Sequence, residues 1–448
     1  MSKFMSILVN KTVTGLLKIT KPVLHKDGSV LPGSIARRFD KNILDKLEYP
    51  KYIIGVTGSS GKGSTTKLIA NILMKNGVKV VWNESGSNLY NAAATLLLNN
   101  SSLKGKIKAD VLLLELDESY IKTIFNKVKL THLVVTNITR DQPARNGHVD
   151  LIFDKIKNSI DDETTLILNA DDPIVNRLKL NHSKVITYGI GDNDYTYKTP
   201  LSDTLDQCYC PVCNKKLVYN YYHYGHLGDY RCLGNDFSRN PVNYEATDLN
   251  LDNKTMFING NPINLHKNIM FNAYAILAAY SVLDGILTND QIVNGLNSSR
   301  KQEVFPTIDG REIEMLDSKN ENNLSFVQSI DYITRCKGKK TIIMGFDNVS
   351  RRYEYNDLSW LYDIDYEKLA NDEEISRIFC IGRFRYDVYA RLIHAGINKK
   401  LITVVDDYKV NLIKELKSNS QGKIYSMVFL DMMDDILKSL SEVHNEKR

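Results

Sequence analysis

The sequence contains no long hydrophobic run, few cysteines and no strong excess of one charge. No apolar stretch among its 448 residues is long enough to span a bilayer. The opening segment, MSKFMSILVNKTVTGLLKITK, lacks the continuous apolar core and the cleavage site of a signal peptide. We therefore expect a cytoplasmic protein. The opening segment is predicted to form a short amphipathic helix that either packs on the body or lies at the inner face of a membrane.

The small charge imbalance and the low cysteine content exclude further classes. A net charge of +5 permits attraction to acidic ligands or to a membrane surface, but it gives no basis for nucleic-acid binding. Six cysteines in a chain of this length do not indicate a disulfide scaffold. The length predicts two or three domains with ordinary globular cores.

The stretch VTGSSGKGSTTKLIA predicts a phosphate-binding loop. Tyr52–Val56 indicates a buried strand and Thr65–Asn76 a helix, and this strand–loop–helix order is what a P-loop requires. The loop glycines let backbone N–H groups converge on phosphates at the positive end of the helix dipole. Lys62 would reach the outer phosphates, and Ser64 or Thr65 would face magnesium. A Gly/Ser turn without a ligand is the alternative.

Near-continuous apolar runs alternate with helical stretches from about residue 52 to 190, which predicts an α/β fold with a parallel sheet. VLLLEL, HLVVTNI and TLILNA are such runs, and each is followed by polar residues at its carboxyl end, where open α/β sheets place ligand sites. Glu115 ends the first run and is a candidate magnesium ligand, because magnesium prefers carboxylate and phosphate oxygens. A solvated acid after a strand is the alternative.

A Cys-, Tyr- and Asn-rich segment at about residues 203–245 interrupts this pattern and predicts a small inserted module. Cys210 and Cys213 share one turn in CPVC, a spacing that lets both thiolates reach one tetrahedral zinc ion. Cys232 would be the third ligand. Its expected partner three residues later is Asn235, a poor zinc ligand.

The fourth zinc ligand is therefore open. Cys208 is the first candidate, because residues two apart on an extended segment point the same way. His223 and His226 are the alternatives. Four protein ligands would make the zinc structural, since no position stays open for a substrate. Free thiols in a reducing cell are the metal-free alternative.

A second α/β pattern begins after NGLNSSRKQEVF, with strands at KTIIMGF and RIFCIG. We predict three regions: an N-terminal helical segment at residues 1–45, a central nucleotide-binding domain at 46–298 that contains the cysteine-rich insertion, and a smaller α/β domain at 299–448. Cys336 and Cys380 stand in apolar surroundings and are predicted core residues.

VTGSSGKGSTTKLIA, LLLELDES, VVTNITRDQPAR and LILNADDP together resemble the ATP-binding central domain of Mur ligases, which join amino acids to peptidoglycan precursors. The insertion before FNAYAILAAY, and the segments SVLPGSIARR, NDLSWLYDIDYE and GRFRYDVYARLIHAGI, are similar to the MurT family of lipid II isoglutaminyl synthase subunits. The resemblance covers nearly the whole chain. It implies a Mur-type central domain with an inserted zinc ribbon and a MurT-type C-terminal domain. About fifty residues precede the P-loop, too few for the uridine-binding domain of ordinary Mur ligases.

The resemblance also implies roles for single residues. Lys62 and Ser64 fall on the phosphate and magnesium positions, and Glu115 on the metal-binding glutamate. Further ATP contacts are expected in the P-loop, after the next strand, near the adenine and from the C-terminal domain: Gly58, Ser59, Gly61, Gly63, Thr65, Asn137, Arg140, Asp141, Asn272 and Lys319. Lys155 would match the lysine that is carbamylated in several Mur ligases.

The reaction implied by the resemblance is amidation. Mur ligases activate a carboxylate as an acyl phosphate, which an amine attacks, and Lys62, magnesium and Lys319 would neutralise the transferring phosphoryl group. For the MurT family the carboxylate is the α-carboxyl of D-glutamate in the lipid II stem peptide, the nucleophile is ammonia and the product is D-isoglutamine. Neither Cys336 nor Cys380 lies on a nucleophile turn, so a partner subunit would supply the ammonia, and the resemblance implies that this partner is a GatD-type glutaminase.

Asp357, in YNDLSW, falls on the acid that reaches the partner in this family and completes its Cys-His-Asp triad. Capping of the following helix is the alternative role.

Two other functions stay open for the whole chain. One is a folylpolyglutamate-synthase-like ligase that acts on a soluble precursor, against which the cysteine insertion and C-terminal motifs argue. The other is a non-catalytic nucleotide-binding scaffold in a cell-wall complex, against which Lys62, Glu115 and Lys319 argue.

Overall fold

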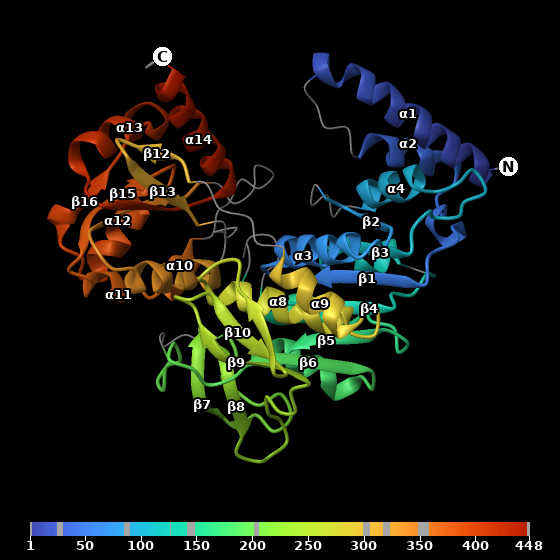
Figure 1. Ribbon diagram of the computed structural model, residues 1–448, viewed down its shortest axis with the longest axis horizontal. Coiled ribbons are helices and arrows are strands. Elements are labelled where there is room, and N and C mark those ends of the chain that lie inside the picture. Colours follow the sequence, from blue (N-terminus) through green and yellow to red (C-terminus); the bar gives the residue numbers. More distant parts are fainter. Residues whose placement is uncertain are drawn as a thin grey trace.

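Two β-sheets with flanking helices form the frame of the protein, shown as a ribbon in Figure 1. The structure is a computed structural model, and it describes residues 2–24, 30–84, 90–125, 127–140, 148–200, 206–298, 305–316, 323–347 and 358–445. The two sheets fall in the segments predicted as the central and C-terminal domains. The boundaries of those domains stay predictions.

The larger sheet has nine strands in the order β11-β10-β9-β6-β5-β4-β1-β3-β2. Pairing is parallel from β2 to β9, and β9, β10 and β11 are joined antiparallel. The predicted parallel sheet is thereby confirmed. The strands are β1 Tyr52–Thr57, β2 Val80–Trp82, β3 Val111–Glu115, β4 His132–Val135, β5 Thr165–Asn169, β6 Val185–Ile190, β9 Tyr244–Asn250, β10 Thr255–Ile258 and β11 Asn261–Asn264.

Alternate residues of the central strands face two separate cores, as the two-residue period of a strand requires. Ile54 and Val56 of β1 belong to one core with α3 and α8, while Ile53 belongs to the other with α4 and α6. Both faces are covered, which explains why these strands are near-continuous apolar runs. The helices and short helical turns of this part are α3 Lys62–Lys75, α4 Tyr90–Asn99, α5 Ile121–Ile124, α6 Val149–Lys157, α7 Pro173–Asn176, α8 Met270–Leu283, α9 Asn289–Asn297, η1 Leu44–Lys46 and η3 Arg177–Asn181.

The smaller sheet has six strands in the order β12-β13-β17-β14-β15-β16, and only β12 and β13 pair antiparallel. Its core contains the fully buried Trp360, which packs against the stacked pair of Phe326 and Phe346, and Cys380 of β15 is a buried core residue as predicted. The strands are β12 Thr307–Ile308, β13 Arg311–Met315, β14 Lys340–Gly345, β15 Ile375–Ile381, β16 Ile402–Val404 and β17 Lys423–Val428. The helices are α10 Asn323–Arg335, η4 Ser359–Asp363, α11 Glu367–Ala370, α12 Arg385–His394, η5 Lys399–Leu401, α13 Tyr408–Asn419 and α14 Leu430–Asn445.

Two N-terminal helices, α1 Ser2–Leu24 and α2 Leu31–Phe39, pack on α4 (Figure 1). Asn10 donates from Nδ2 to the carbonyl of Thr95 at 3.2 Å and to Asn99 Oδ1 at 2.9 Å. A Cβ atom at Gly33 would lie 2.2 Å from the carbonyl oxygen of Asn91, so only glycine permits this close approach of α2. One face of the predicted amphipathic helix therefore packs on the body. Among the described residues, no helix is long and apolar enough to cross a membrane.

The cysteine-rich insertion contains an antiparallel hairpin of β7 Leu217–Tyr224 and β8 Leu227–Cys232, between β6 and β9 in the chain. It lies beneath the nine-stranded sheet in Figure 1 and reaches the C-terminal part, because a Cβ at Gly225 would lie 2.4 Å from Leu324 Cδ2. The insertion therefore touches both sheet-bearing parts.

Candidate functional site

The predicted phosphate-binding loop joins β1 to α3. Gly58 has φ +128° and Gly61 has φ +82°, conformations that favour glycine. A Cβ at Gly58 would lie 2.3 Å from Thr136 Oγ1, and one at Gly61 would lie 2.7 Å from Phe271 Cε2. Helix α3 begins at Lys62, three residues before the predicted start at Thr65, because Gly61 takes the N-cap position. The N-terminal amides of α3 therefore face the loop, as anion binding requires.

Asn137 and Ser59 hold the shape of this loop. Asn137 Oδ1 accepts from the backbone N–H of Ser60 at 3.0 Å, and its Nδ2 donates to the Ser60 carbonyl at 3.1 Å. Ser59 donates its backbone N–H to the Asn137 carbonyl at 2.8 Å and its hydroxyl to the Thr139 carbonyl at 3.1 Å. Asn137 was expected close to the triphosphate. In the structure it is a positioning residue for the loop, and direct contact with a nucleotide stays a prediction.

Lys62 and Glu118 form a buried ion pair at the start of α3. Lys62 Nζ lies 3.1 Å from Glu118 Oε1 and also donates to the carbonyl of Gly58. The two side chains are only 9% and 6% exposed. Glu118 was not among the predicted site residues, although it follows a strand end only three residues after Glu115. Its pairing with Lys62 depends on the approach of β3 to α3, which the sequence does not show.

Glu115 ends β3 and approaches the first turn of α3. Its Oε2 lies 3.2 Å from the Cβ position of Gly63, so the absence of a side chain there makes room for the carboxylate. Asn83 fixes the Glu115 backbone by donating to its carbonyl at 2.9 Å and accepting from its N–H at 2.8 Å. Ser64 is exposed and Thr65 is buried. Of the two hydroxyls expected to face magnesium, only that of Ser64 is therefore open to solvent.

Arg140 links the nucleotide side of the protein to the C-terminal part. Its Nε lies 3.1 Å from Asp206 Oδ1 and its Nη1 lies 2.7 Å from Asp363 Oδ2 in η4. Thr139 Oγ1 donates to Asn323 Oδ1 of α10 at 2.9 Å, beside this ion pair. Arg140 was expected to approach the triphosphate, and here two carboxylates hold it.

Asn272 lies in the first turn of α8, next to the Phe271 ring that packs near Gly61. Its Oδ1 accepts from the backbone N–H groups of His266 and Lys267 at 2.8 and 3.0 Å. Only the amide NH2 end of this side chain would therefore be suited to an adenine contact, which stays a prediction. Asp141, Lys319 and Asp357 lie outside the described residues, and their roles stay predictions as well.

The cysteine cluster has a different fourth member from the one expected. Ligand atoms of Cys210, Cys213, Cys232 and Asp236 all lie within 4.8 Å of one another. The predicted Cys208 is not in this group. The reason is the turn after Cys232: Asn235 adopts φ +59°, and the chain bends so that Asp236, rather than Asn235, points back towards the thiols.

The geometry of this cluster suits a metal. The Sγ atoms of Cys213 and Cys232 are 3.3 Å apart. Backbone N–H groups point at two of the sulfurs: Val212 at Cys210 Sγ, 3.4 Å, and Gly234 at Cys232 Sγ, 3.2 Å. Such N–H groups favour the thiolate form that a metal requires. Three thiols and a carboxylate are ligand types that zinc accepts in a tetrahedral site.

His223 and His226, the alternative zinc ligands, are buried away from the cysteines. His223 Nε2 lies 3.0 Å from the carbonyl of Ile190, and burial lowers its pKa. His226 Nε2 lies 3.3 Å from Asp172 Oδ1 and its Nδ1 lies 3.7 Å from Asp206 Oδ2. Burial acts to lower the pKa of His226, but the two carboxylates outweigh it and raise that pKa. The two histidines, the fallback zinc ligands, are not in the group formed by Cys210, Cys213, Cys232 and Asp236. They attach the hairpin to the central sheet.

We expect His226 to make stability depend on pH. Because its pKa is raised in the folded state, the stabilisation is complete below the unfolded value of about 6.5 and is lost as pH rises through the folded value. His226→Gln should therefore lower the free energy of unfolding more at pH 6 than at pH 9, measured by denaturant titration. His148→Gln is the control, since that side chain is 69% exposed. A His226→Gln effect equal at both pH values would contradict the pairing.

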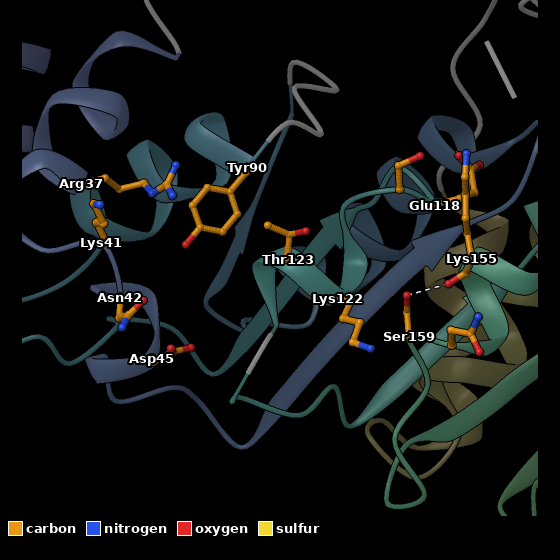
Figure 2. A pocket seen from close by; sticks show the side chains of 12 residues that line it. Arg37, Lys41, Asn42, Asp45, Tyr90, Glu118, Lys122, Thr123, Lys155 and Ser159 are labelled. Atoms are coloured by element: carbon orange, nitrogen blue, oxygen red, sulfur yellow. Dashed lines mark hydrogen bonds between the residues drawn. The ribbon is translucent and has the colours of Figure 1, made fainter.

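A cavity of about 740 Å³ lies beside Glu118, between the N-terminal helices and α6 (Figure 2). Arg37 stacks over the Tyr90 ring at 4.0 Å and donates to Asn91 Oδ1 at 2.8 Å. Because Glu118 lines this cavity and also pairs with Lys62, the cavity adjoins the P-loop. Its lining contains four cations and two acids: Arg37, Lys41, Asn42, Asp45, Tyr90, Glu118, Ser119, Lys122, Thr123, Lys155, Asn158 and Ser159. Of these, only Lys155 was proposed from the sequence.

Known protein families and single proteins match this chain. The family model described as Mur ligase middle domain matches residues 56–227, and that described as MurT ligase C-terminal matches residues 320–429. Subunit MurT of the glutamine-hydrolysing lipid II isoglutaminyl synthase from Staphylococcus aureus (strain COL) is 30% identical over 397 residues, 86% of this chain and 87% of that protein.

Solved structures show the same fold at lower identity. A pseudomurein peptide ligase type C from Methanothermus fervidus has a TM-score of 0.67 at 20% identity, over 94% of this chain and 86% of that one. The MurF ligase from Thermotoga maritima in complex with ADP has a TM-score of 0.56 at 14% identity, over 93% and 85%. With both family models matched and a relative 30% identical over most of both chains, this protein belongs to the MurT family of Mur-type ligases.

Proposed function

We propose that this chain is the synthase subunit of a lipid II isoglutaminyl synthase, which converts the α-carboxylate of D-glutamate in the stem peptide to an amide. The observation that carries the proposal is the Lys62–Glu118 ion pair, because it joins the phosphate-binding loop to the cation-lined cavity. A triphosphate on the loop and an acidic acceptor in the cavity would then be neighbours. The S. aureus relative carries the name of this activity.

The proposed chemistry has two steps. A carboxylate oxygen of the acceptor attacks the γ-phosphorus of ATP, the bond from that phosphorus to the β,γ-bridging oxygen breaks, and ADP leaves. Ammonia then attacks the acyl carbon, the carbon–oxygen bond to phosphate breaks, and phosphate leaves with formation of the amide and loss of a proton. Lys62 and Lys319 would neutralise the charge on the transferring phosphoryl group. Magnesium, held near Ser64 and Glu115, would add positive charge there.

The acceptor is proposed to bind through the cations of the cavity. Arg37, Lys41 and Lys122 line it from two sides, and a carboxylate or a phosphate would pair with them (Figure 2). Lys155 lines the same cavity, and its backbone carbonyl accepts from Ser159 Oγ at 2.7 Å. We propose that Lys155 is the counterpart of the carbamylated lysine of several Mur ligases, since a carbamate there would lie close to the nucleotide side.

Ammonia is proposed to come from a GatD-type glutaminase partner. Cys380 is buried in β15, and burial raises its pKa to about 12, which makes it unsuited to act as a nucleophile. Cys336 lies at the end of α10, with its backbone N–H bonded to the carbonyls of Tyr332 and Ile333. The relative is itself named as one subunit of a glutamine-hydrolysing enzyme.

The direct test is reconstitution with a glutaminase partner. The purified pair, supplied with lipid II, ATP and glutamine, should yield lipid II whose mass has fallen by the difference between a hydroxyl and an amino group. A gain of a whole amino-acid residue on a soluble acceptor would instead support the folylpolyglutamate-synthase-like alternative. No ATP turnover with either acceptor would support the scaffold alternative.

We also propose that the cysteine cluster binds structural zinc, with Cys210, Cys213, Cys232 and Asp236 as ligands. Metal analysis should show about one equivalent of zinc per chain. Cys232→Ser should remove most of it and lower the thermal unfolding temperature, because the metal joins two turns of the insertion. Asp236→Ala should weaken binding of zinc in a chelator competition.

Cys208→Ser is the matched control for the zinc experiment, because Cys208 lies outside the group of four ligands. It should keep the full zinc content and the wild-type unfolding temperature. Loss of zinc in Cys208→Ser, with retention in Asp236→Ala, would restore the assignment made from the sequence.

A further inference from the structure

Helix α1 has one packed face and one open face. Ser6, Ile7 and Asn10 are buried towards α2 and α4. Figure 1 shows α1 at the outer edge of the molecule, above α2 and α4, with its other side facing away from the body. The packed face holds α1 against the rest of the protein. The open face does not contribute to this attachment.

The open face of α1 is apolar. Large apolar side chains are solvent-exposed in two groups, Phe4 46%, Met5 36% and Leu8 39% near its start and Leu16 58% and Ile19 76% two turns further along. At 3.6 residues per turn these positions fall within one arc of about 120°, opposite to the arc of Ser6 and Asn10. Scattered exposed apolar residues are ordinary, but a stripe of five large apolar side chains within one arc of a helix indicates an interaction surface.

The surroundings of this stripe are basic. Residues 2–24 contain no Asp or Glu and have lysines at positions 3, 11, 18 and 21. The loop beside α1 adds exposed Lys104, Lys106 and Lys108, and a Cβ at Gly105 in this loop would lie 2.1 Å from Lys3 Cε. Partial burial, and then the neighbouring charge of Lys108, lower the pKa of Lys11. Cations are therefore crowded at the edge of the apolar stripe.

Two acids near this surface, among the residues that the structure describes, are already paired. Asp40 Oδ2 accepts from Lys46 at 2.6 Å and from the Ser2 hydroxyl at 3.1 Å. Glu48 lies 3.0 Å from Lys106. The pairing leaves Lys3, Lys11, Lys18, Lys104 and Lys108 as the excess positive charge around α1.

We propose that the open face of α1 docks the protein on the surface of an anionic lipid bilayer. The apolar stripe would enter the boundary between headgroups and acyl chains, and the lysines would contact the anionic headgroups. The charge pattern favours a bilayer over a second copy of the chain, because two copies joined through this face would bring the same lysines together.

Docking through α1 would also orient the cavity. Helix α2 packs on α1 and contributes Arg37 to the cavity lining. A protein held by α1 would therefore present this cavity near the headgroup layer, where a lipid-linked acceptor carries its polar part. The benefit to catalysis rests on the proposed function, whereas the binding itself does not.

The test is co-sedimentation of the full chain with vesicles of phosphatidylglycerol and phosphatidylcholine, compared with vesicles of phosphatidylcholine alone. Binding should require the anionic lipid and decrease with added salt. Leu16→Glu/Ile19→Glu should lower the partition coefficient by about tenfold or more, since it removes apolar contact and adds two negative charges. Val410→Glu is the control, because that residue is 70% exposed on α13, far along the chain from α1.

A second measurement reports the depth of α1. Leu16→Trp should show a blue-shifted emission with anionic vesicles and no shift with phosphatidylcholine alone. Equal binding of the wild type and Leu16→Glu/Ile19→Glu would overturn the proposal. So would a wild-type dimer in lipid-free solution that this double variant dissociates, because a second copy would then cover the face.

Activity measurements test the docking inference separately from the proposed function. Leu16→Glu/Ile19→Glu should amidate a water-soluble acceptor without the long lipid chain at the wild-type rate, and should lose activity on acceptor embedded in anionic vesicles. If the wild type binds vesicles but amidates neither acceptor, the docking inference stands and the proposed function fails.

Discussion

Replacing Lys62 with alanine is expected to lower kcat for ATP-dependent amidation by about 10²–10³ or more. Lys62 is the cation that the loop places at the N-terminus of α3, where the γ-phosphoryl group would be transferred. A loss of charge there raises the energy of the transition state more than that of bound ATP. The measurement is phosphate release and amide formation by the reconstituted complex, with nucleotide affinity followed separately.

The structure adds a complication to this experiment and a way to resolve it. Lys62→Ala leaves the carboxylate of Glu118 buried without its lysine, which by itself lowers the free energy of unfolding by about 3 kcal/mol. Lys62→Ala/Glu118→Gln removes that charge and should recover most of the lost stability without recovering activity. Lys67→Ala, an exposed position on the same helix, is the control and should behave as the wild type. Near-normal amidation by the double variant would disprove the role of the loop.

Asp357→Asn is expected to lower glutamine-dependent amidation by about 10⁴, if Asp357 completes the glutaminase triad. An asparagine caps a helix about as well as an aspartate, but it cannot stabilise an imidazolium in the partner. Amidation with excess ammonium salt should survive, because the acyl-phosphate chemistry takes place elsewhere. The ratio of glutamine-dependent to ammonium-dependent rates therefore reports the role of this one carboxylate.

Asp365→Asn is the matched control for Asp357→Asn, since it makes the same change in the same segment. Both variants should still co-purify with the partner. A wild-type rate of Asp357→Asn with glutamine would leave helix capping as the role of this residue. Loss of both glutamine- and ammonium-dependent activity would instead indicate damage to the ligase site, against the separation of the two sites.

The sequence by itself determined the central α/β sheet and the place of the candidate site. Buried parallel strands require near-continuous apolar runs, so β1, β3, β4 and β5 were recognisable, and their strand ends located Lys62, Glu115 and Asn137. The start of α3 was placed too late, because the left-handed conformation of Gly61 is a property of the folded loop. Local periodicity carries no information about such single backbone conformations.

Contacts between distant segments were decided only by the tertiary structure. The pairing of Lys62 with Glu118, the bridge from Arg140 to Asp363 and the position of Asp236 among the cysteines depend on how loops approach one another. The cavity joins residues from α2, α4 and α6, which no spacing in the chain connects. The spacing of apolar residues and of glycines predicts helices, strands and turns, because each of these patterns reflects a local requirement of the backbone. Which side chains contact one another between different helices, strands and loops depends on tertiary packing, and this packing exists only in the folded chain.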